Sequence, residues 1–272
     1  MSAFWTSVTW NAMAGAYPGR AGSRPTIDGR RAYRGHVPDL RFYFDPACPF
    51  AWMTSKWVRT VQRRRAYEVE WRFVSLRLLN AHVDYDAHFP AGYEAGHTAG
   101  LRLLRLAARV REEHGPDVVA PLYEALGRLL YERTEQPDEG GSRTRAIATG
   151  ALEAVGLPAR LGTALDDEGL DAVVRAETDE ALALTGKDVG TPILHFAPPE
   201  GTALFGPVIS RLPAEDEAVA LWDHVVALAA FPGFAELKRS LRERPQLPSF
   251  GVRTGEVGLV EDWHGGSRRL KR

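Results

Sequence analysis

The chain has 272 residues, of which 44% are hydrophobic and 25% are charged, with a formal net charge of −1 at pH 7. This composition is typical of a globular protein with a sizeable core, and no apolar run approaches the ~20 residues of a transmembrane helix, which excludes a membrane-spanning protein. The single cysteine excludes a disulfide framework, an iron–sulfur cluster, a cysteine-based zinc site and an internal pair of redox thiols.

Charge is distributed unevenly along the chain. Residues 1–37 carry a net charge of +4 and residues 237–272 a net charge of +5, which leaves −10 on residues 38–236. An acidic body with short basic ends argues against nucleic acid as the main partner. We interpret 1–37, which has neither a sustained period nor a secretory signal, as a disordered leader, and 237–272 as a solvated basic tail.

The first ordered elements form a βαβ unit. Apolar and polar residues alternate over 40–45, and two prolines end that predicted strand. A helix is expected to follow and to end near Arg65. Residues 67–74 alternate strictly and give the clearest strand pattern in the chain. This order of elements is typical of a parallel strand pair joined by a helix.

The pattern changes to a helical one from about 86 to 186. Leucine, alanine and valine recur there at spacings of three and four, with a polar break over 134–145. A β-hairpin is expected over 192–205, and a last amphipathic helix over about 214–230. The predicted order is therefore β-α-β, a helical insertion of about 100 residues, and β-β-α.

The single cysteine, Cys48, lies between Pro46 and Pro49, just after a predicted strand and at the predicted start of a helix. The first turn of a helix has unpaired N–H groups and the positive end of the helix dipole, which stabilise a thiolate. A lone cysteine is more often a small buried hydrophobic residue. The flanking prolines and the strand end favour a reactive nucleophile here.

A second candidate segment is Val189-Gly190-Thr191-Pro192, where the proline opens the predicted hairpin. Proline at the first position of a strand is structurally ordinary. Together with the order of elements, the segment predicts a cis-proline whose loop packs beside Cys48 and presents backbone groups to a bound thiol.

These segments resemble the DsbA-like branch of the thioredoxin fold. The resemblance rests on the strand followed by Asp-Pro-x-Cys-Pro, the helical insertion, and the Asp-Val-Gly-Thr-Pro segment at 188–192. The strings at 205–213 and 231–239 are similar to those of the actinobacterial mycothiol-dependent nitroreductase group, and the resemblance covers about residues 39–244.

The resemblance implies an α/β, thioredoxin-like fold with a helical insertion domain. The thioredoxin-like domain is expected to comprise 38–85 and 187–236, and the inserted helical domain 86–186. It also implies an oxidoreductase or transferase that uses mycothiol as co-substrate, with Cys48 as the catalytic residue. The residues expected to shape the thiol-binding groove are Pro49, Phe50, Trp52, Thr191 and Pro192.

One departure from the family pattern changes the expected mechanism. The family motif is Cys-Pro-Trp-Cys, whereas this chain reads Cys48-Pro49-Phe50-Ala51, so the resolving cysteine is absent. Thiol–disulfide chemistry must then be monothiol: the cysteine attacks, forms a mixed disulfide or thiol adduct with a small thiol, and a second small-thiol molecule releases it.

The expected partners are a small electrophilic substrate and a low-molecular-weight thiol, with no nucleic acid and no membrane, and a homodimer stays open. No metal and no nucleotide cofactor are predicted, because neither a metal-ligand motif nor a phosphate-binding loop is present. A single thiol without an export signal is expected in the reducing cytoplasm. The electrophile stays open among a nitro compound, a mixed disulfide and a natural-product intermediate.

Two alternative functions are retained. A diverged DsbA-like protein would bind a small ligand or a partner without redox turnover, since a fold does not by itself carry a function. A glutathione-transferase-kappa-like isomerase shares the architecture, but it fits the C-terminal strings less well.

Other candidate residues have simpler interpretations. Near Asp84 and Asp86, His82, His88 and His97 are expected in a polar loop rather than in a metal site. His195 is expected to be structural.

The aromatic residues are likewise divided between those expected in the core and those expected at the site. The strand residues Tyr43, Trp71 and Phe73 are expected in the core. Tyr93 is a candidate, with Phe50 and Trp52, for a hydrophobic pocket beside the cysteine.

Overall fold

The computed structural model describes residues 37–134, 141–239, 241–253, 255–256 and 258–262. The predicted leader therefore lies outside the described residues, except for its last one. From Val37 onward the described residues belong to one compact unit. Its strands are β1 (Leu40–Phe44), β2 (Val69–Phe73), β3 (Ile193–Phe196), β4 (Ala203–Phe205), β5 (Leu241–Glu243) and β6 (Val260–Asp262).

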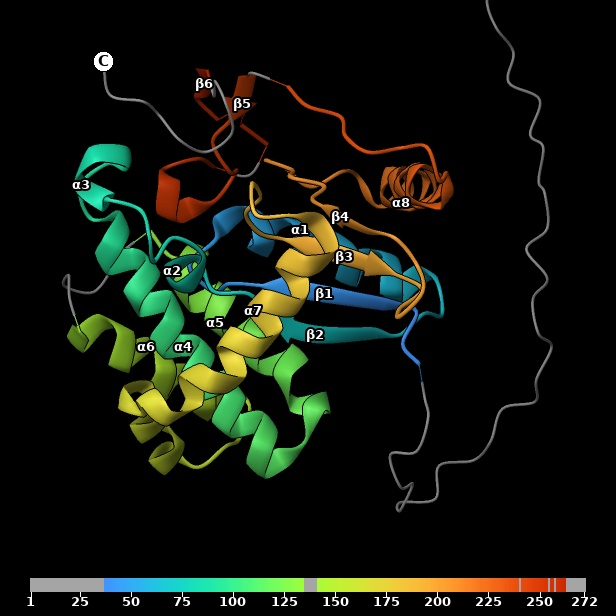
Figure 1. Cartoon of the computed structure of the whole chain (residues 1–272). Coiled ribbons are helices and arrows are strands. Elements are labelled where there is room, and N and C mark those ends of the chain that lie inside the picture. Colours follow the sequence, from blue (N-terminus) through green and yellow to red (C-terminus); the bar gives the residue numbers. More distant parts are fainter. Residues whose placement is uncertain (1–36, 135–140, 240, 254, 257, 263–272) are drawn as a thin grey trace, which may run out of the picture. The chain divides into compact units, whose positions relative to one another are not determined.

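Helices account for most of the described chain (Figure 1). The α-helices are α1 (Pro49–Arg64), α2 (Leu76–Leu79), α3 (Tyr85–His88), α4 (Tyr93–His114), α5 (Val119–Tyr131), α6 (Gly141–Ala154), α7 (Asp171–Thr185) and α8 (Glu215–Ala230). Short 3-10 helices are η1 (Pro116–Val118), η2 (Ala159–Asp166), η3 (Glu168–Leu170) and η4 (Pro248–Phe250). No described helix has an apolar stretch long enough to span a bilayer.

The main sheet has the strand order β2-β1-β3-β4. Strand β1 runs parallel to β2 and antiparallel to β3, which pairs antiparallel with β4. A βαβ unit followed by a β-hairpin and a helix, in this strand order, is the thioredoxin-like arrangement. The helical insertion lies between β2 and β3, as DsbA-like proteins have it, and the fold prediction is confirmed.

Alternation along β1 places its side chains on two buried faces. Phe42 and Phe44 pack against Trp71 and α5, where Phe44 stacks on Tyr123 with ring centroids 3.8 Å apart. Tyr43 faces the opposite side and packs with Ala181 of α7. Because both faces are covered, the core residues predicted in the strands are buried.

Helices α5 and α8 cover the same face of the sheet, because Tyr123 of α5 contacts Phe44 and Trp222 of α8 contacts Phe196, which shares that face. Figure 1 shows α4, α5 and α6 gathered together and α8 apart from them. Helix α8 packs against α1, and the rings of Trp57 and Trp222 lie 5.5 Å apart across that contact. The helices of the insertion share one core with the sheet. Two details differ from the expected pattern: α2 follows β2 directly, and α6 begins at Gly141, inside the expected break at 134–145.

The C-terminal region is more ordered than its composition indicates. The predicted solvated tail contains β5, η4 and β6, and the Leu247 side chain is fully buried in the main core. The Gln246 N–H donates to the Ser210 carbonyl at 2.6 Å, which ties this region to the chain ahead of α8. The apolar residues of this region are spaced too widely to give a periodic pattern, so the sequence does not predict its ordered elements.

Candidate thiol site

Cys48 occupies the N-cap of α1, as its position between two prolines predicts. Its backbone is extended (φ −93°, ψ 110°), and Pro49 takes the first helical position, where no N–H is needed. The Cys48 Sγ accepts a hydrogen bond from the Ala51 N–H at 3.4 Å. This N–H and the N-terminus of α1 stabilise negative charge on the sulfur.

The Thr191–Pro192 peptide bond is cis, which confirms the prediction for this loop. The Cys48 Sγ lies 3.3 Å from the Thr191 carbonyl oxygen, to which the thiol donates. Two contacts fix the loop: the Thr191 hydroxyl donates to the Tyr43 carbonyl at 3.2 Å, and the Gly206 N–H donates to the Pro192 carbonyl at 2.8 Å. The loop ahead of β3 and the start of α1 therefore meet at the sulfur.

Asp45, at the end of β1, is a buried carboxyl beneath the same turn. One of its oxygens accepts from the Ala47 N–H at 2.8 Å and the other from the Leu76 N–H at 2.7 Å. Burial raises the pKa of the Asp45 carboxyl to about 7, although both N–H donors act to lower it. The carboxyl thus holds the Cys48 turn against the N-terminus of α2.

Two phenols from α5 lie near the sulfur. The Tyr131 hydroxyl donates to the Pro46 carbonyl at 2.8 Å. Burial raises the pKa of both Tyr123 and Tyr131, and the nearby Cys48 raises both further. The sequence contains no local signal that these two tyrosines lie near the cysteine.

The predicted groove residues divide into two groups. Pro49 and Phe50 are half-buried beside the cysteine, at the start of α1. Trp52 is 2% exposed, and its indole N–H donates to Glu132 at 2.9 Å. Its ring lies so close to Gly127 that a Cβ there would sit 2.2 Å from it. The Trp52 ring therefore packs against α5, and its place in a ligand groove stays a prediction.

The predicted aromatic pocket is also divided. Tyr93 begins α4 and is 42% exposed. It stacks on Phe89 with ring centroids 5.6 Å apart, in a cluster that includes Tyr85 and His97. Trp52 lies instead among Tyr123 and Gly127 of α5.

The histidines that the sequence groups together have separate partners. His97 Nδ1 lies 2.9 Å from the Tyr85 hydroxyl, and burial lowers the pKa of His97 to about 4. His88 Nδ1 lies 2.9 Å from the Asp84 carbonyl oxygen. Within the described ranges, no group of three or more His, Cys, Asp or Glu side chains is arranged to hold a metal ion. His195 is buried in β3.

A family model matches residues 47–239, the region that contains the thiol site and both flanking halves of the fold. That model describes the Rv2466c-like proteins, the mycothiol-dependent nitroreductase Rv2466c and its relatives. The chain belongs to this family. The predicted resemblance is thereby confirmed, and the family description together with the site supports a thiol oxidoreductase.

Among curated proteins, the chain is similar to the uncharacterized protein Rv2286c of Mycobacterium tuberculosis, strain ATCC 25618 / H37Rv. It is 34% identical over 198 residues, which cover 73% of this chain and 80% of the relative.

Solved structures give weaker likenesses. A proposed protein disulfide isomerase from Nitrosomonas europaea aligns with a TM-score of 0.46 at 17% identity, over 70% of this chain and 99% of that chain. The cytosolic disulfide reductase DsbM from Pseudomonas aeruginosa aligns with a TM-score of 0.45 at 16% identity, over 70% and 99%.

Proposed function

We propose that the protein is a monothiol oxidoreductase that uses mycothiol and acts on a disulfide bond, with Cys48 as the nucleophile. One observation carries the proposal. The cysteine sulfur lies at the N-cap of α1, 3.3 Å from the carbonyl oxygen of Thr191, beside the cis-proline Pro192. The family description names mycothiol as the small thiol. The sequence has a single cysteine, so the proposed chemistry uses only one protein thiol.

The sulfur environment suits a small-thiol adduct. The Ala51 N–H donates to the sulfur and so stabilises the thiolate form. The Thr191 carbonyl accepts from the thiol and becomes available to another donor, such as a ligand amide N–H, once the sulfur is bonded to a second sulfur. Half-buried Pro49 and Phe50 border the same turn.

The proposed reaction has two exchange steps. The Cys48 thiolate attacks the mycothiol sulfur of a mixed disulfide between mycothiol and a substrate thiol. That S–S bond breaks, the substrate leaves as a thiolate and takes up a proton, and mycothiol becomes disulfide-bonded to Cys48. A second mycothiol thiolate attacks the bound mycothiol sulfur, which releases mycothiol disulfide and restores the cysteine thiolate.

One mixed disulfide and one mycothiol thus give one substrate thiol and one mycothiol disulfide. The substrate sulfur is reduced and the second mycothiol is oxidised. Ala51 occupies the position from which a resolving cysteine would attack, so the second step needs an external thiol. This requirement fits a compartment rich in reduced thiol, and we propose the cytoplasm.

A turnover assay tests the proposal. The mixed disulfide of mycothiol with a chromogenic thiol is supplied with reduced mycothiol, and release of the chromogenic thiol is followed. We expect a rate that saturates with reduced mycothiol, and Cys48→Ser is expected to fall to the uncatalysed rate. An Ala51→Cys variant provides a second readout, because an internal resolving thiol should release bound mycothiol without the external one. Full activity of Cys48→Ser would overturn the proposal.

A further inference from the structure

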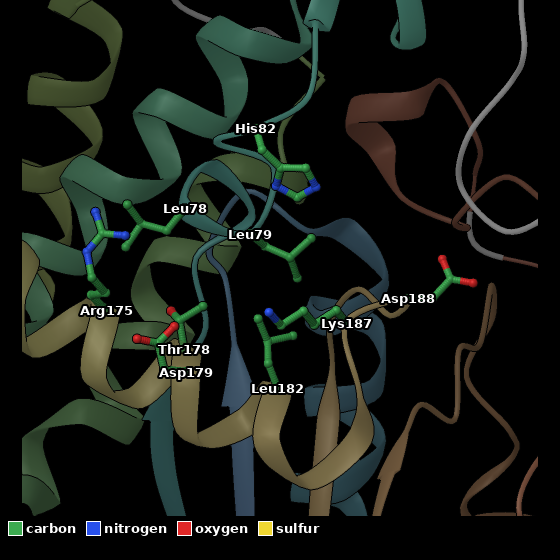
Figure 2. A pocket seen from close by; sticks show the side chains of 9 residues that line it. All are labelled: Leu78, Leu79, His82, Arg175, Thr178, Asp179, Leu182, Lys187 and Asp188. Atoms are coloured by element: carbon green, nitrogen blue, oxygen red, sulfur yellow. The ribbon is translucent and has the colours of Figure 1, made fainter.

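A cavity of about 390 Å³ lies between α2, α7 and the loop that leads to the cis-proline (Figure 2). This volume is within the range of small-molecule sites, roughly 300–1,000 Å³. Its lining combines an aliphatic part with charged side chains. The lining residues are Leu78, Leu79, His82, Arg175, Thr178, Asp179, Leu182, Lys187 and Asp188.

The spacing along α7 explains one wall. Residues 175, 178, 179 and 182 recur at three and four, so they form one stripe of the helix. Gly186 ends α7 with a positive φ of 85°, which residues with a side chain rarely adopt. The chain therefore turns back after the helix, and Figure 2 shows the Lys187 side chain beside Leu182.

Both walls of the cavity continue into the thiol site. On one side, the N-terminus of α2 is held by Asp45, three residues before Cys48, through the 2.7 Å bond from the Leu76 N–H. On the other side, three residues lead from Asp188 to Thr191, whose carbonyl accepts from the cysteine thiol. Three extended residues span roughly 10 Å at most. The cavity thus lies at the same edge of the sheet as the sulfur.

The charged side chains of the cavity form no ion pair or hydrogen bond with the described part of the chain. Elsewhere arginines pair with carboxylates, as Arg105 does with Asp171 at 2.6 Å. Arg175, Asp179 and Lys187 have no ion pair or hydrogen bond of their side chains in the described ranges. Such groups in a hollow are available to a ligand.

The types of these groups define the chemistry that fits. Lys187 and Arg175 offer donors and Asp179 offers an acceptor. A ligand anion would be repelled by the two aspartates, Asp179 and Asp188, and a ligand cation by the two basic groups. A hydroxyl both donates and accepts, so a neutral group with several hydroxyls satisfies both kinds of partner. Leu79 and Leu182 provide an apolar surface for the carbon skeleton of such a group.

We propose that this cavity binds the neutral polyhydroxyl portion of the thiol co-substrate while its sulfur reacts at Cys48. The inference rests on the proposed function, since it takes mycothiol as that co-substrate. In mycothiol the polyhydroxyl portion is the glucosamine–inositol unit. The cavity then selects this thiol over smaller thiols that lack such a unit.

The test measures how fast Cys48 forms its mixed disulfide at increasing concentrations of oxidised mycothiol. The test variant is Asp179→Ala/Lys187→Ala, and the matched control is Asp216→Ala/Lys238→Ala, which leaves net charge equally unchanged. In the test variant, the concentration of oxidised mycothiol that gives the half-maximal rate is expected to rise about tenfold, because two hydrogen bonds are lost. The limiting rate is expected to stay unchanged. The control is expected to match the wild type.

Bis(2-hydroxyethyl) disulfide serves as a probe without the sugar unit, and all three proteins should react with it equally. An unchanged mycothiol response in the test variant would overturn the inference and leave the proposed function standing. An equal loss with both probes would also overturn it. Absence of any Cys48 adduct in the wild type, with either disulfide, would instead overturn the proposed function.

Discussion

At the scale of single residues, the position of Cys48 joins two parts of the fold. The helix N-cap supplies an N–H donor from Ala51, and the Thr191 carbonyl supplies an acceptor from a loop that is 143 residues away along the chain. A buried hydrophobic cysteine would need neither contact. The residue types alone indicate this site. A proline at the first helical position indicates the helix start that supplies the N–H, and a proline that opens a strand indicates the loop that supplies the carbonyl.

Asp45 titrates in an unusual range and so gives a prediction on stability. The folded protein keeps a proton on this buried carboxyl up to about pH 7, whereas its ordinary pKa is 3.8. Between these values the folded state binds more protons than the unfolded state. The free energy of unfolding therefore decreases as pH rises from about 4 to 7, by up to about 1.4 kcal/mol per pH unit from this group.

Asp45→Asn removes that titration, so its free energy of unfolding should fall less over the same pH interval. Urea unfolding of both proteins at several pH values measures the difference. His97, whose pKa is lowered to about 4, acts in the opposite sense in both proteins and cancels in the comparison. Parallel pH curves for wild type and variant would show that Asp45 does not titrate in this range.

At the scale of elements, α4 crosses directly over the Asp45 turn. Gly100 permits this approach, since a Cβ there would lie 2.4 Å from the Asp45 Oδ1 and 2.8 Å from the Ala47 Cβ. The loops after β1 and β2 and the loop before β3 meet at the same edge of the sheet. Close packing of the helical insertion on this edge thus shapes the cysteine turn.

Gly100→Ala tests this contact. The added methyl group overpacks a buried site, and we expect a loss of about 1–3 kcal/mol in the free energy of unfolding. At Gly96, one turn earlier in α4, an added Cβ would meet no other described part of the chain within 4 Å. Gly96→Ala should therefore stabilise the helix by up to about 1 kcal/mol. Equal effects of the two changes in denaturant unfolding would contradict the packing described for α4.

The elements that sequence patterns predict well are those with a regular period. Strands β1 and β2 and the helical insertion follow from alternation and from three-and-four spacing. Trp52 shows the limit, because the sequence places it four residues after Cys48 but contains no signal that its ring packs on Gly127. The contacts of Asp45 and Tyr131 join distant segments, and no local pattern encodes them.

At the scale of the whole molecule, one core supports the sheet, the helical insertion and the C-terminal region. Leu247 is fully buried in that core although its surroundings in the sequence are polar and basic. Composition averages over many residues and does not detect a single buried leucine. The thiol site therefore lies in a scaffold to which segments beyond the family match at 47–239 contribute.

Intact-mass spectrometry of the native protein, before and after incubation with oxidised mycothiol, tests the central claim most directly. We expect one mycothiol adduct per chain, located on Cys48 by peptide mapping and removed by reduced mycothiol. The denatured protein serves as the control for simple thiol accessibility. A native protein that forms no adduct, while the denatured chain does, would contradict the assignment of Cys48 as the nucleophile.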